Sequence, residues 1–275
     1  MLMALLTACY SEMPTADVAD GVKLVTFNLT GEGFGSPTFT RATALDESDM
    51  TDLWVFDFED EECVQSLHLT PEDEGWSAPQ MTLAMGEHNV CFVASRGDDP
   101  ELDEDAQTIT WTVPRDCFWA DKDVTVSQSS GSSVAVALNR VATKLRVVIT
   151  DEVPANVATI SVKPPNWYYG LNYWTGEPAG QREQERSVTV PSSYVGTTGQ
   201  LAASFFGLST KNEWTTDVVV TSKNSDGEAI ASVTITAAPF KAGRATEYSG
   251  RLFGQDAGMS VTLNDEWQDS YVGSW

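Results

Sequence analysis

Short runs of alternating apolar and polar residues recur along the chain and predict β-strands. In the first run, Val22–Leu29, the side chains of Lys23, Val25, Phe27 and Leu29 share one face, which is richer in large apolar groups than the other. Clusters of Gly, Pro, Asn and Asp separate the runs, as is typical of antiparallel sandwiches. The sequence therefore predicts an all-β fold. Further strands are expected at 52–58, 64–69, 88–94, 108–113, 124–126, 134–138, 144–150, 157–163, 187–190, 201–206, 217–222, 229–236, 246–253 and 260–263.

An acidic stretch at residues 98–107 (DDPELDEDAQ) is the one long segment with helical character. Its run of like charges favours a solvated loop. The stretch lacks the Asp-x-Asp-x-Asp-Gly spacing of a calcium loop, and neither His68 nor His88 has a second His or Cys two or four residues away. No metal site and no cofactor are expected.

Charge divides the chain into two unlike parts. The formal net charge is −24, and residues 1–120 hold 24 of the 40 acidic residues but four of the 16 basic ones, which leaves −20 there and −4 in the remainder. So large an acidic excess repels phosphate backbones and excludes nucleic acid as a partner. Together with the Ser/Gly stretch at 127–133, the charge break predicts two domains, 22–138 and 139–275.

The first residues have the pattern of an export signal. Leu6-Thr7-Ala8-Cys9 resembles a bacterial lipobox, in which small residues precede the Cys that accepts the lipid. We interpret residues 1–21 as a partial lipoprotein signal, with its upstream part missing from this chain, followed by a flexible tether. A chance Cys in an apolar start is the alternative. The lipid anchor at Cys9 predicts export.

No catalytic motif is found in the sequence. Ser-nucleophile elbows, H-E-x-x-H motifs and phosphate-binding loops are absent, so no enzyme is expected. Cys63, Cys91 and Cys117 allow at most one disulfide or three buried thiols, and the spacing does not decide between them. An aromatic cluster offers a platform for sugar rings, a subunit contact or simple packing; it contains Trp167, Tyr168, Tyr169, Tyr173 and Trp174.

Three stretches together resemble FimA-type fimbrillins, the subunits of type V pili, and their lipoprotein relatives. They are Thr38–Thr43, which follows the first strand, the basic and aliphatic Leu138–Val147, and Phe240–Phe253 followed by Val261–Trp267. With the lipobox, the resemblance extends nearly from end to end. It implies a lipidated precursor with two transthyretin-like, Greek-key β-sandwich domains. It also implies a place in a cell-surface fimbrium that serves adhesion, on the outer membrane of a Gram-negative bacterium.

The resemblance also implies how such subunits join. A trypsin-like protease cuts after an Arg beyond the first strand, the strand leaves, and a neighbouring subunit refills the groove by strand addition. Here the removable strand is Val22–Leu29, whose Val25, Phe27 and Leu29 are expected to fill the groove. Arg41 is the candidate cleavage site because no other basic residue lies between Lys23 and Arg96, and Ala42 would become the first residue.

Val261, Leu263 and Trp267 are the candidate donor-strand residues. Whether the subunit serves as stalk, tip or anchor stays open, and so does an uncleaved role for Arg41. The other partners implied are further fimbrial subunits and a host protein or glycan receptor. The alternative function is a surface lipoprotein that binds glycans through the aromatic cluster.

Overall fold

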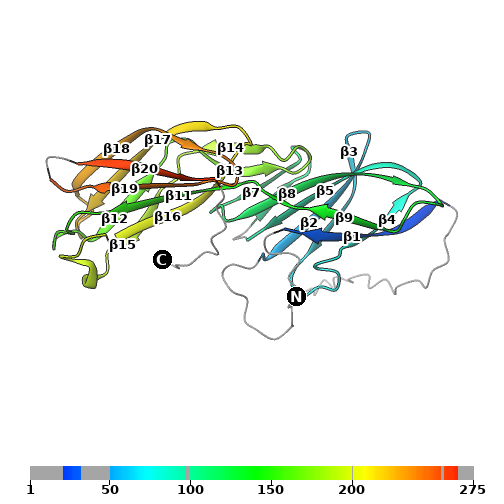
Figure 1. Ribbon diagram of the computed structural model, residues 1–275, viewed down its shortest axis with the longest axis horizontal. Helices are drawn as coiled ribbons and strands as arrows, with labels where there is room; N and C mark the ends of the chain where they lie inside the picture. The colour runs from blue at the N-terminus through cyan, green and yellow to red at the C-terminus, as the bar shows by residue number, and fades with distance from the viewer. Residues whose placement is uncertain (1–20, 32–49, 97–99, 200, 255–256, 266–275) are drawn as a thin grey trace, which may run out of the picture.

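The structure is a computed structural model that describes residues 21–31, 50–96, 100–199, 201–254 and 257–265. It confirms the all-β fold: twenty strands and one short 3-10 helix, η1 (Ser192–Tyr194), make up the regular structure of this part of the chain. Two elongated halves lie end to end (Figure 1). None of the described residues belongs to a helix with the length and apolar character that a bilayer crossing requires.

The amino-terminal half is built from two facing sheets. One has the order β4-β1-β9 and the other has the order β10-β8-β5-β2-β3. Alternating apolar side chains from both sheets fill the space between them, including Phe27, Leu53 and Phe92. The strand bounds are β1 (Val22–Thr30), β2 (Asp52–Glu59), β3 (Glu62–Leu69), β4 (Gln80–Ala84), β5 (Gly86–Ser95), β8 (Cys117–Val126), β9 (Ser133–Ala137) and β10 (Asn139–Arg140).

The carboxy-terminal half has the same two-sheet plan. Its sheets have the orders β16-β11-β19-β20 and β15-β12-β17-β18, and Leu145, Trp167 and Val220 lie in the core that they enclose. The strand bounds are β11 (Ala142–Ile149), β12 (Thr159–Lys163), β15 (Arg186–Thr189), β16 (Leu201–Leu208), β17 (Trp214–Lys223), β18 (Ala229–Phe240), β19 (Ala245–Arg251) and β20 (Gly258–Asn264).

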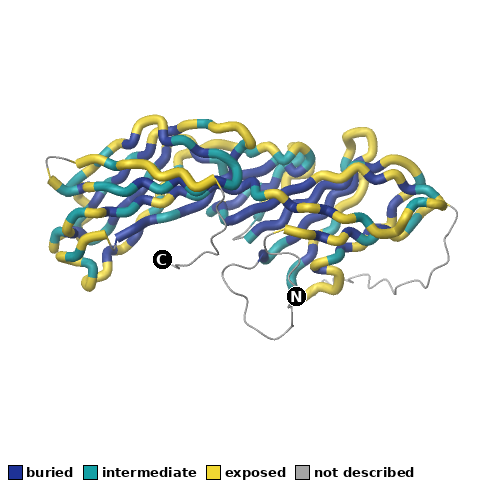
Figure 2. Tube along the Cα trace, in the orientation of Figure 1, coloured by how far each residue is buried: buried dark blue, intermediate teal, exposed yellow. Residues whose placement is uncertain are grey.

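A fifth sheet joins the halves. Its order is β14-β13-β7-β6, from β6 (Pro100–Asp103), β7 (Thr108–Trp111), β13 (Trp167–Asn172) and β14 (Pro178–Arg182). A third apolar cluster lies beside it and includes Phe56, Trp119, Tyr173 and Phe206. Buried residues consequently continue through the region where the halves meet (Figure 2). This sheet spans the predicted boundary near residue 139; the division into two transthyretin-like domains stays a prediction.

Two details differ from what the sequence suggested. Residues Pro100–Asp103 form β6, because they pair with β7, although their acidic run favoured a loop. The predicted strand at 124–126 is the end of the longer β8, in which Cys117 and Trp119 are buried in the third cluster. Cys63, Cys91 and Cys117 are free thiols, and burial raises the pKa of each.

Candidate functional site

β1 lies in the middle of its sheet, yet each of its edges is only half occupied. Residues Val22–Thr26 pair with β4 in antiparallel orientation, and Thr26–Thr30 pair with β9 in parallel orientation. Two further backbone bonds, from Phe27 N to Pro79 O (2.9 Å) and from Leu29 N to Ser77 O (3.4 Å), extend the contact beyond β4. The strand is therefore held by ladder bonds on both sides.

The inward face of β1 carries the three residues that the sequence singled out. Val25, Phe27 and Leu29 are 1%, 0% and 4% exposed, and the Phe27 ring meets the ring of Phe92 edge-on at 5.1 Å between centroids. These side chains contribute to the core between the two sheets of the amino-terminal half. Removing β1 would leave a groove where they lie.

Polar side chains attach β1 to the loop between β8 and β9. The Lys23 ammonium donates to the Ser127 carbonyl oxygen (3.1 Å), to the Ser130 hydroxyl (3.3 Å) and to the Ser130 carbonyl oxygen. Asn28 donates to the Ser133 hydroxyl at 2.7 Å. The Ser/Gly stretch that supported the predicted domain boundary therefore holds β1 in place through these hydrogen bonds.

Several predicted site residues lie outside the described residues. They are the lipidation candidate Cys9, the cleavage candidates Arg41 and Ala42, and Trp267 of the proposed donor segment. The described chain stops at Gly31 and resumes at Met50, so the cleavage candidates fall in the connection between β1 and β2.

β20 is an edge strand with an exposed apolar face. Within the described part of the chain it pairs with β19 alone, and Val261 and Leu263 are 47% and 42% exposed. Met259, Val261 and Leu263 share one face by alternation, and Met259 packs on the core of the carboxy-terminal half. An exposed apolar edge of this kind is a ready template for pairing with another chain.

An arginine forms an ion pair with the residue that follows β20. Arg244 is 7% exposed and donates through Nε to Asp265 and through Nη1 to Glu213. The guanidinium lowers the pKa of Asp265, and the two carboxylates raise that of Arg244. The predicted donor residues Val261 and Leu263 therefore lie just before Asp265, which is held by its ion pair with Arg244.

The predicted aromatic platform is divided between two cores. Trp167 is 0% exposed and donates from Nε1 to the Phe206 carbonyl at 2.9 Å, while Tyr173 is 1% exposed and stacks on Phe56 at 3.9 Å between centroids. Burial raises the pKa of Tyr173 to about 12. These two rings are unavailable to a ligand.

The other three rings are half-buried and engaged with neighbours. The Tyr168 ring meets the Trp214 ring edge-on, and the centroids of the Trp174 and Phe58 rings lie 6.1 Å apart. The Arg182 guanidinium lies 4.1 Å from the centre of the Tyr169 ring. Packing accounts for most of the aromatic surface in this segment.

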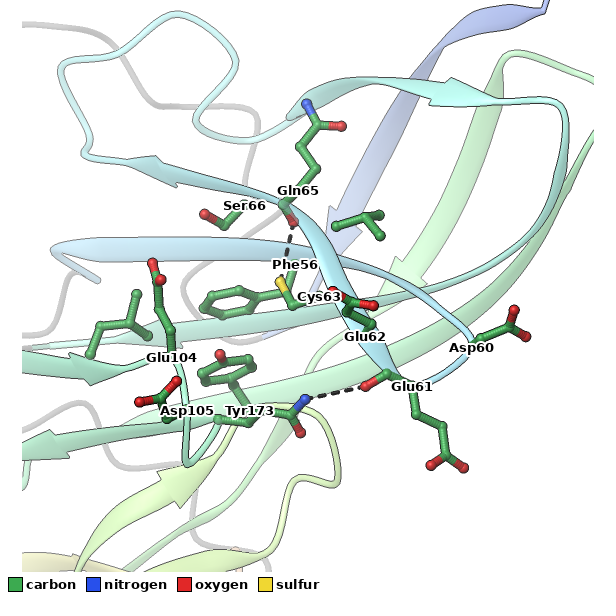
Figure 3. A pocket seen from close by; sticks show the side chains of 13 residues that line it. Phe56, Asp60, Glu61, Glu62, Cys63, Gln65, Ser66, Glu104, Asp105 and Tyr173 are labelled. Carbon is green, nitrogen blue, oxygen red and sulfur yellow. Dashed lines mark hydrogen bonds between the residues drawn. The ribbon is translucent and has the colours of Figure 1, made fainter.

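Two acidic hollows lie beside the aromatic segment. The hollow in Figure 3, about 610 Å³, has Phe56, Cys63 and Tyr173 among its lining residues, together with five carboxylates, those of Asp60, Glu61, Glu62, Glu104 and Asp105. The other, about 680 Å³, is lined in part by Trp119, Trp174, Asp121 and Asp123. Their carboxylates disfavour anionic ligands.

The structure also brings together a cluster that sequence spacing missed. Asp57 and Glu59 of β2 meet His88 of β5, with ligand atoms of all three within 4.8 Å of one another. The residues lie on neighbouring strands, so no short-range spacing could reveal them.

The same fold occurs in solved structures of bacterial proteins, and 42 such chains match. A candidate adhesin from Bacteroides ovatus has a TM-score of 0.56 and 10% identity, with 82% of this chain and 88% of that chain covered. A candidate polysaccharide-binding protein from Bacteroides thetaiotaomicron has a TM-score of 0.54 and 8% identity, covering 88% and 96%. For the fimbrial anchor protein Mfa2 from Porphyromonas gingivalis the TM-score is 0.52 and the identity 10%, covering 89% and 97%. At these identities the likeness concerns the fold.

Sequence comparison assigns the family. Residues 102–273 match the family of unknown function DUF6562, and the chain belongs to that family. No curated protein matches the sequence.

Proposed function

We propose that this protein is a structural or accessory subunit of a cell-surface fimbria, exported as a lipoprotein and assembled by strand exchange after proteolysis. The observation that carries the proposal is the position of β1. This strand occupies the middle of a sheet, packs three side chains into the core and is joined to β2 by a long connection that contains Arg41. The fold shared with candidate adhesins and a fimbrial anchor protein supports the same role.

Cleavage after Arg41 would leave β1 held only by noncovalent contacts. Full burial of a large apolar side chain contributes about 1.5–3 kcal/mol, so Val25, Phe27 and Leu29 together account for about 5–9 kcal/mol. A groove that loses this much stabilisation favours capture of another apolar strand. The ladder edges of β4 and β9 would supply backbone hydrogen bonds to it.

β20 has the side-chain pattern that such a groove requires. Met259, Val261 and Leu263 repeat at every second position, as do Val25, Phe27 and Leu29 in β1. The two donor-candidate side chains that the sequence named here, Val261 and Leu263, are already exposed. We infer that this segment, with the residues after it, enters the groove of the next subunit.

Controlled proteolysis tests the cleavage step. A trypsin-like protease added to the full chain is expected to yield a fragment that begins at Ala42 and SDS-resistant oligomers. Arg41→Lys keeps a basic cleavage residue and should behave as the parent chain, whereas Arg41→Gln should stay monomeric. Oligomers of equal length from Arg41→Gln would overturn the cleavage step. In assembled native material, a first residue at Cys9 would indicate an uncleaved anchor.

Charged substitutions test the donor step. Val261→Asp or Leu263→Asp places a carboxylate on the face that enters the groove and should shorten the oligomers strongly. Thr262→Asp adds the same charge to the opposite face of β20 and is the matched control. Because all three side chains are exposed in the monomer, its stability should change little. Unchanged oligomer length in Val261→Asp and Leu263→Asp would exclude this strand as the donor.

Glycan binding is the second candidate function. It rests on the hollow that Trp119, Trp174 and Asp123 help to line, which offers ring faces and hydrogen-bond acceptors to a neutral sugar. A glycan array probed with the full chain and with Trp174→Ala would test it. Equal signals from both proteins would place any binding elsewhere, and an absent signal from both would remove this candidate.

We propose no catalytic role. Both histidines are engaged with carboxylates: His68 Nε2 lies 2.9 Å from Asp52 Oδ1 while its ring stacks on Trp54, and His88 is buried against Asp57. The raised pKa values of the three thiols, each caused by burial, also oppose nucleophilic use.

A further inference from the structure

Asp57, Glu59 and His88 converge at one end of the core in the amino-terminal half. In the antiparallel ladder of β2 and β5, Phe58 lies opposite Asn89, so Asp57, Glu59 and His88 project on the same side of the sheet. His88 Nδ1 lies 2.9 Å from Asp57 Oδ1 and 3.8 Å from Glu59 Oε1. The side chains of His88 and Asp57 are 1% and 3% exposed, and that of Glu59 is 46% exposed.

The other ring nitrogen of His88 fixes the state of the imidazole. Nε2 lies 3.0 Å from the Ala84 carbonyl oxygen, which can only accept, so Nε2 carries a hydrogen. Nδ1 is therefore the nitrogen that faces the two carboxylates. A histidine that donates one N–H to a backbone carbonyl while its other nitrogen faces acidic oxygens has the orientation of metal-binding histidines.

The spacing of the three ligand atoms suits a small tetrahedral ion. Zn²⁺ bonds to nitrogen and oxygen at about 2.0–2.2 Å, which places neighbouring ligand atoms roughly 3.4 Å apart. The two distances from Nδ1, 2.9 Å and 3.8 Å, bracket this value. The exposed Glu59 gives the ion access from solvent and leaves a fourth position for water.

Charge also favours a divalent cation. Burial raises the pKa of Asp57, although the neighbouring His88 opposes the shift. Asp57 and Glu59 are both acidic, and the Asp57 side chain is 3% exposed, so an opposite charge beside it is favourable. A divalent ion between the three side chains would balance the charges of the two carboxylates, with the imidazole as the third ligand.

We infer that Asp57, Glu59 and His88 form a binding site for a divalent transition-metal ion of the zinc type, which joins β2 to β5 at the end of the amino-terminal core. The ion binds His88 Nδ1, Asp57 Oδ1 and Glu59 Oε1. Imidazole and carboxylate ligands together favour Zn²⁺ over Ca²⁺ and Mg²⁺. This site is independent of strand exchange and adds a requirement for metal to the stability of this half.

Zn²⁺ titration of the chelator-treated full chain tests the inference. Calorimetry at pH 7 should give one saturable site. Thermal unfolding at a Zn²⁺ concentration one hundred times the Kd should shift upward by about 5 °C. Ca²⁺ should not compete. Absence of saturable Zn²⁺ binding, or tighter binding of Ca²⁺, would overturn the site.

Variants of the half-exposed ligand keep the test independent of folding. Glu59→Gln should weaken Zn²⁺ binding at least tenfold. Glu62→Gln is the matched control, because Glu62 lies opposite Glu59 in the β2–β3 ladder, is exposed and lies outside the cluster. It should bind as the parent chain does. Equal weakening in both variants would show an effect of surface charge alone and would overturn the assignment of Glu59 as a ligand.

Discussion

The first strands of the two halves, β1 and β11, have the same place in their sheets but differ in how the chain holds them. Each pairs antiparallel on one side and parallel on the other, and each buries three alternating apolar side chains: Val25, Phe27 and Leu29 in β1, and Leu145, Val147 and Ile149 in β11. β11 pairs along its whole length with β16 and follows β10 after one residue. β1 divides its length between two partners, and a long connection follows it.

Under the proposed assembly, this difference makes β1 the strand that is exchanged and β11 the strand that stays. Both strands contribute similar packing, so burial alone does not identify the replaceable one. A single cut in the connection after β1 would free that strand from the rest of the chain, whereas β11 is continuous with structure on both sides. The following predictions probe this contrast, from the largest expected effect to the smallest.

Removal of β1 should have the largest effect. A chain that starts at Ala42 is expected to lose about 5–9 kcal/mol of stability in the amino-terminal half, because Val25, Phe27 and Leu29 are absent. Urea unfolding followed by tryptophan fluorescence measures the loss. A peptide of residues 22–30 should restore stability, and the same peptide with Phe27→Asp should not. Undiminished stability without the peptide would contradict the role of β1 in the core.

Truncation of one buried side chain in each strand should distinguish the two strands after assembly. Phe27→Ala is expected to cost about 3–5 kcal/mol and Leu145→Ala about 2–5 kcal/mol in the monomer. In strand-exchanged oligomers the Phe27→Ala effect should vanish, because β1 has left, whereas the Leu145→Ala effect should remain. Unfolding of purified oligomers is the measurement. A persistent Phe27→Ala effect would mean that β1 stays in place.

Gly207→Ala should destabilise the carboxy-terminal half alone. A Cβ at Gly207 would lie 2.4 Å from the indole of Trp167, which is fully buried and hydrogen-bonded. Displacement of the ring is expected to lower the free energy of unfolding of this half by about 1–3 kcal/mol. Gly131→Ala is a suitable control because none of the described residues places an atom within 4 Å of the added carbon. Equal unfolding midpoints for both variants would show that Trp167 can move freely.

Lys23→Met should lower the free energy needed to open β1 by about 1 kcal/mol. The substitution removes the ammonium that donates hydrogen bonds to the Ser127–Ser130 loop. Faster hydrogen exchange of the β1 amides should report the change, with those of β11 unaffected. Lys122→Met, at an exposed position of β8, is the control for the loss of charge. Exchange that speeds up equally in both variants would show that the loss of charge, and not the loss of the Lys23 hydrogen bonds, causes the effect.

Salt should have the smallest effect. Attraction between the acidic first half and the basic residues of a neighbour's second half would be screened, so added salt should slow assembly slightly. Three of the basic residues in the second half already have acidic partners: Arg140 pairs with Asp116, Arg146 with Glu247 and Lys163 with Glu183. Light scattering at several ionic strengths measures the rate, and acceleration by salt would rule out this attraction.

Side-chain alternation predicted the all-β fold and most strands because at least one face of most strands is buried. It missed β4, β6, β13 and β14; residues such as Pro178 and Gln181 of β14 form a strand only through pairing with β13. The aromatic segment read as a possible surface platform, yet long-range contacts bury Trp167 and Tyr173 in different cores. Asp57 and His88 lie 31 positions apart, and only the pairing of β2 with β5 brings them together.

The sheet that joins the two halves has a mechanical consequence. Strands β7 and β13 come from opposite sides of the predicted boundary and are hydrogen-bonded to each other, and β10 is likewise paired with β8. Tension along the molecule would load these ladders in parallel with the backbone, and their bonds would have to break before the halves could separate. A fibre of such subunits should therefore bend and yield at its joints, while each subunit behaves as a stiff rod.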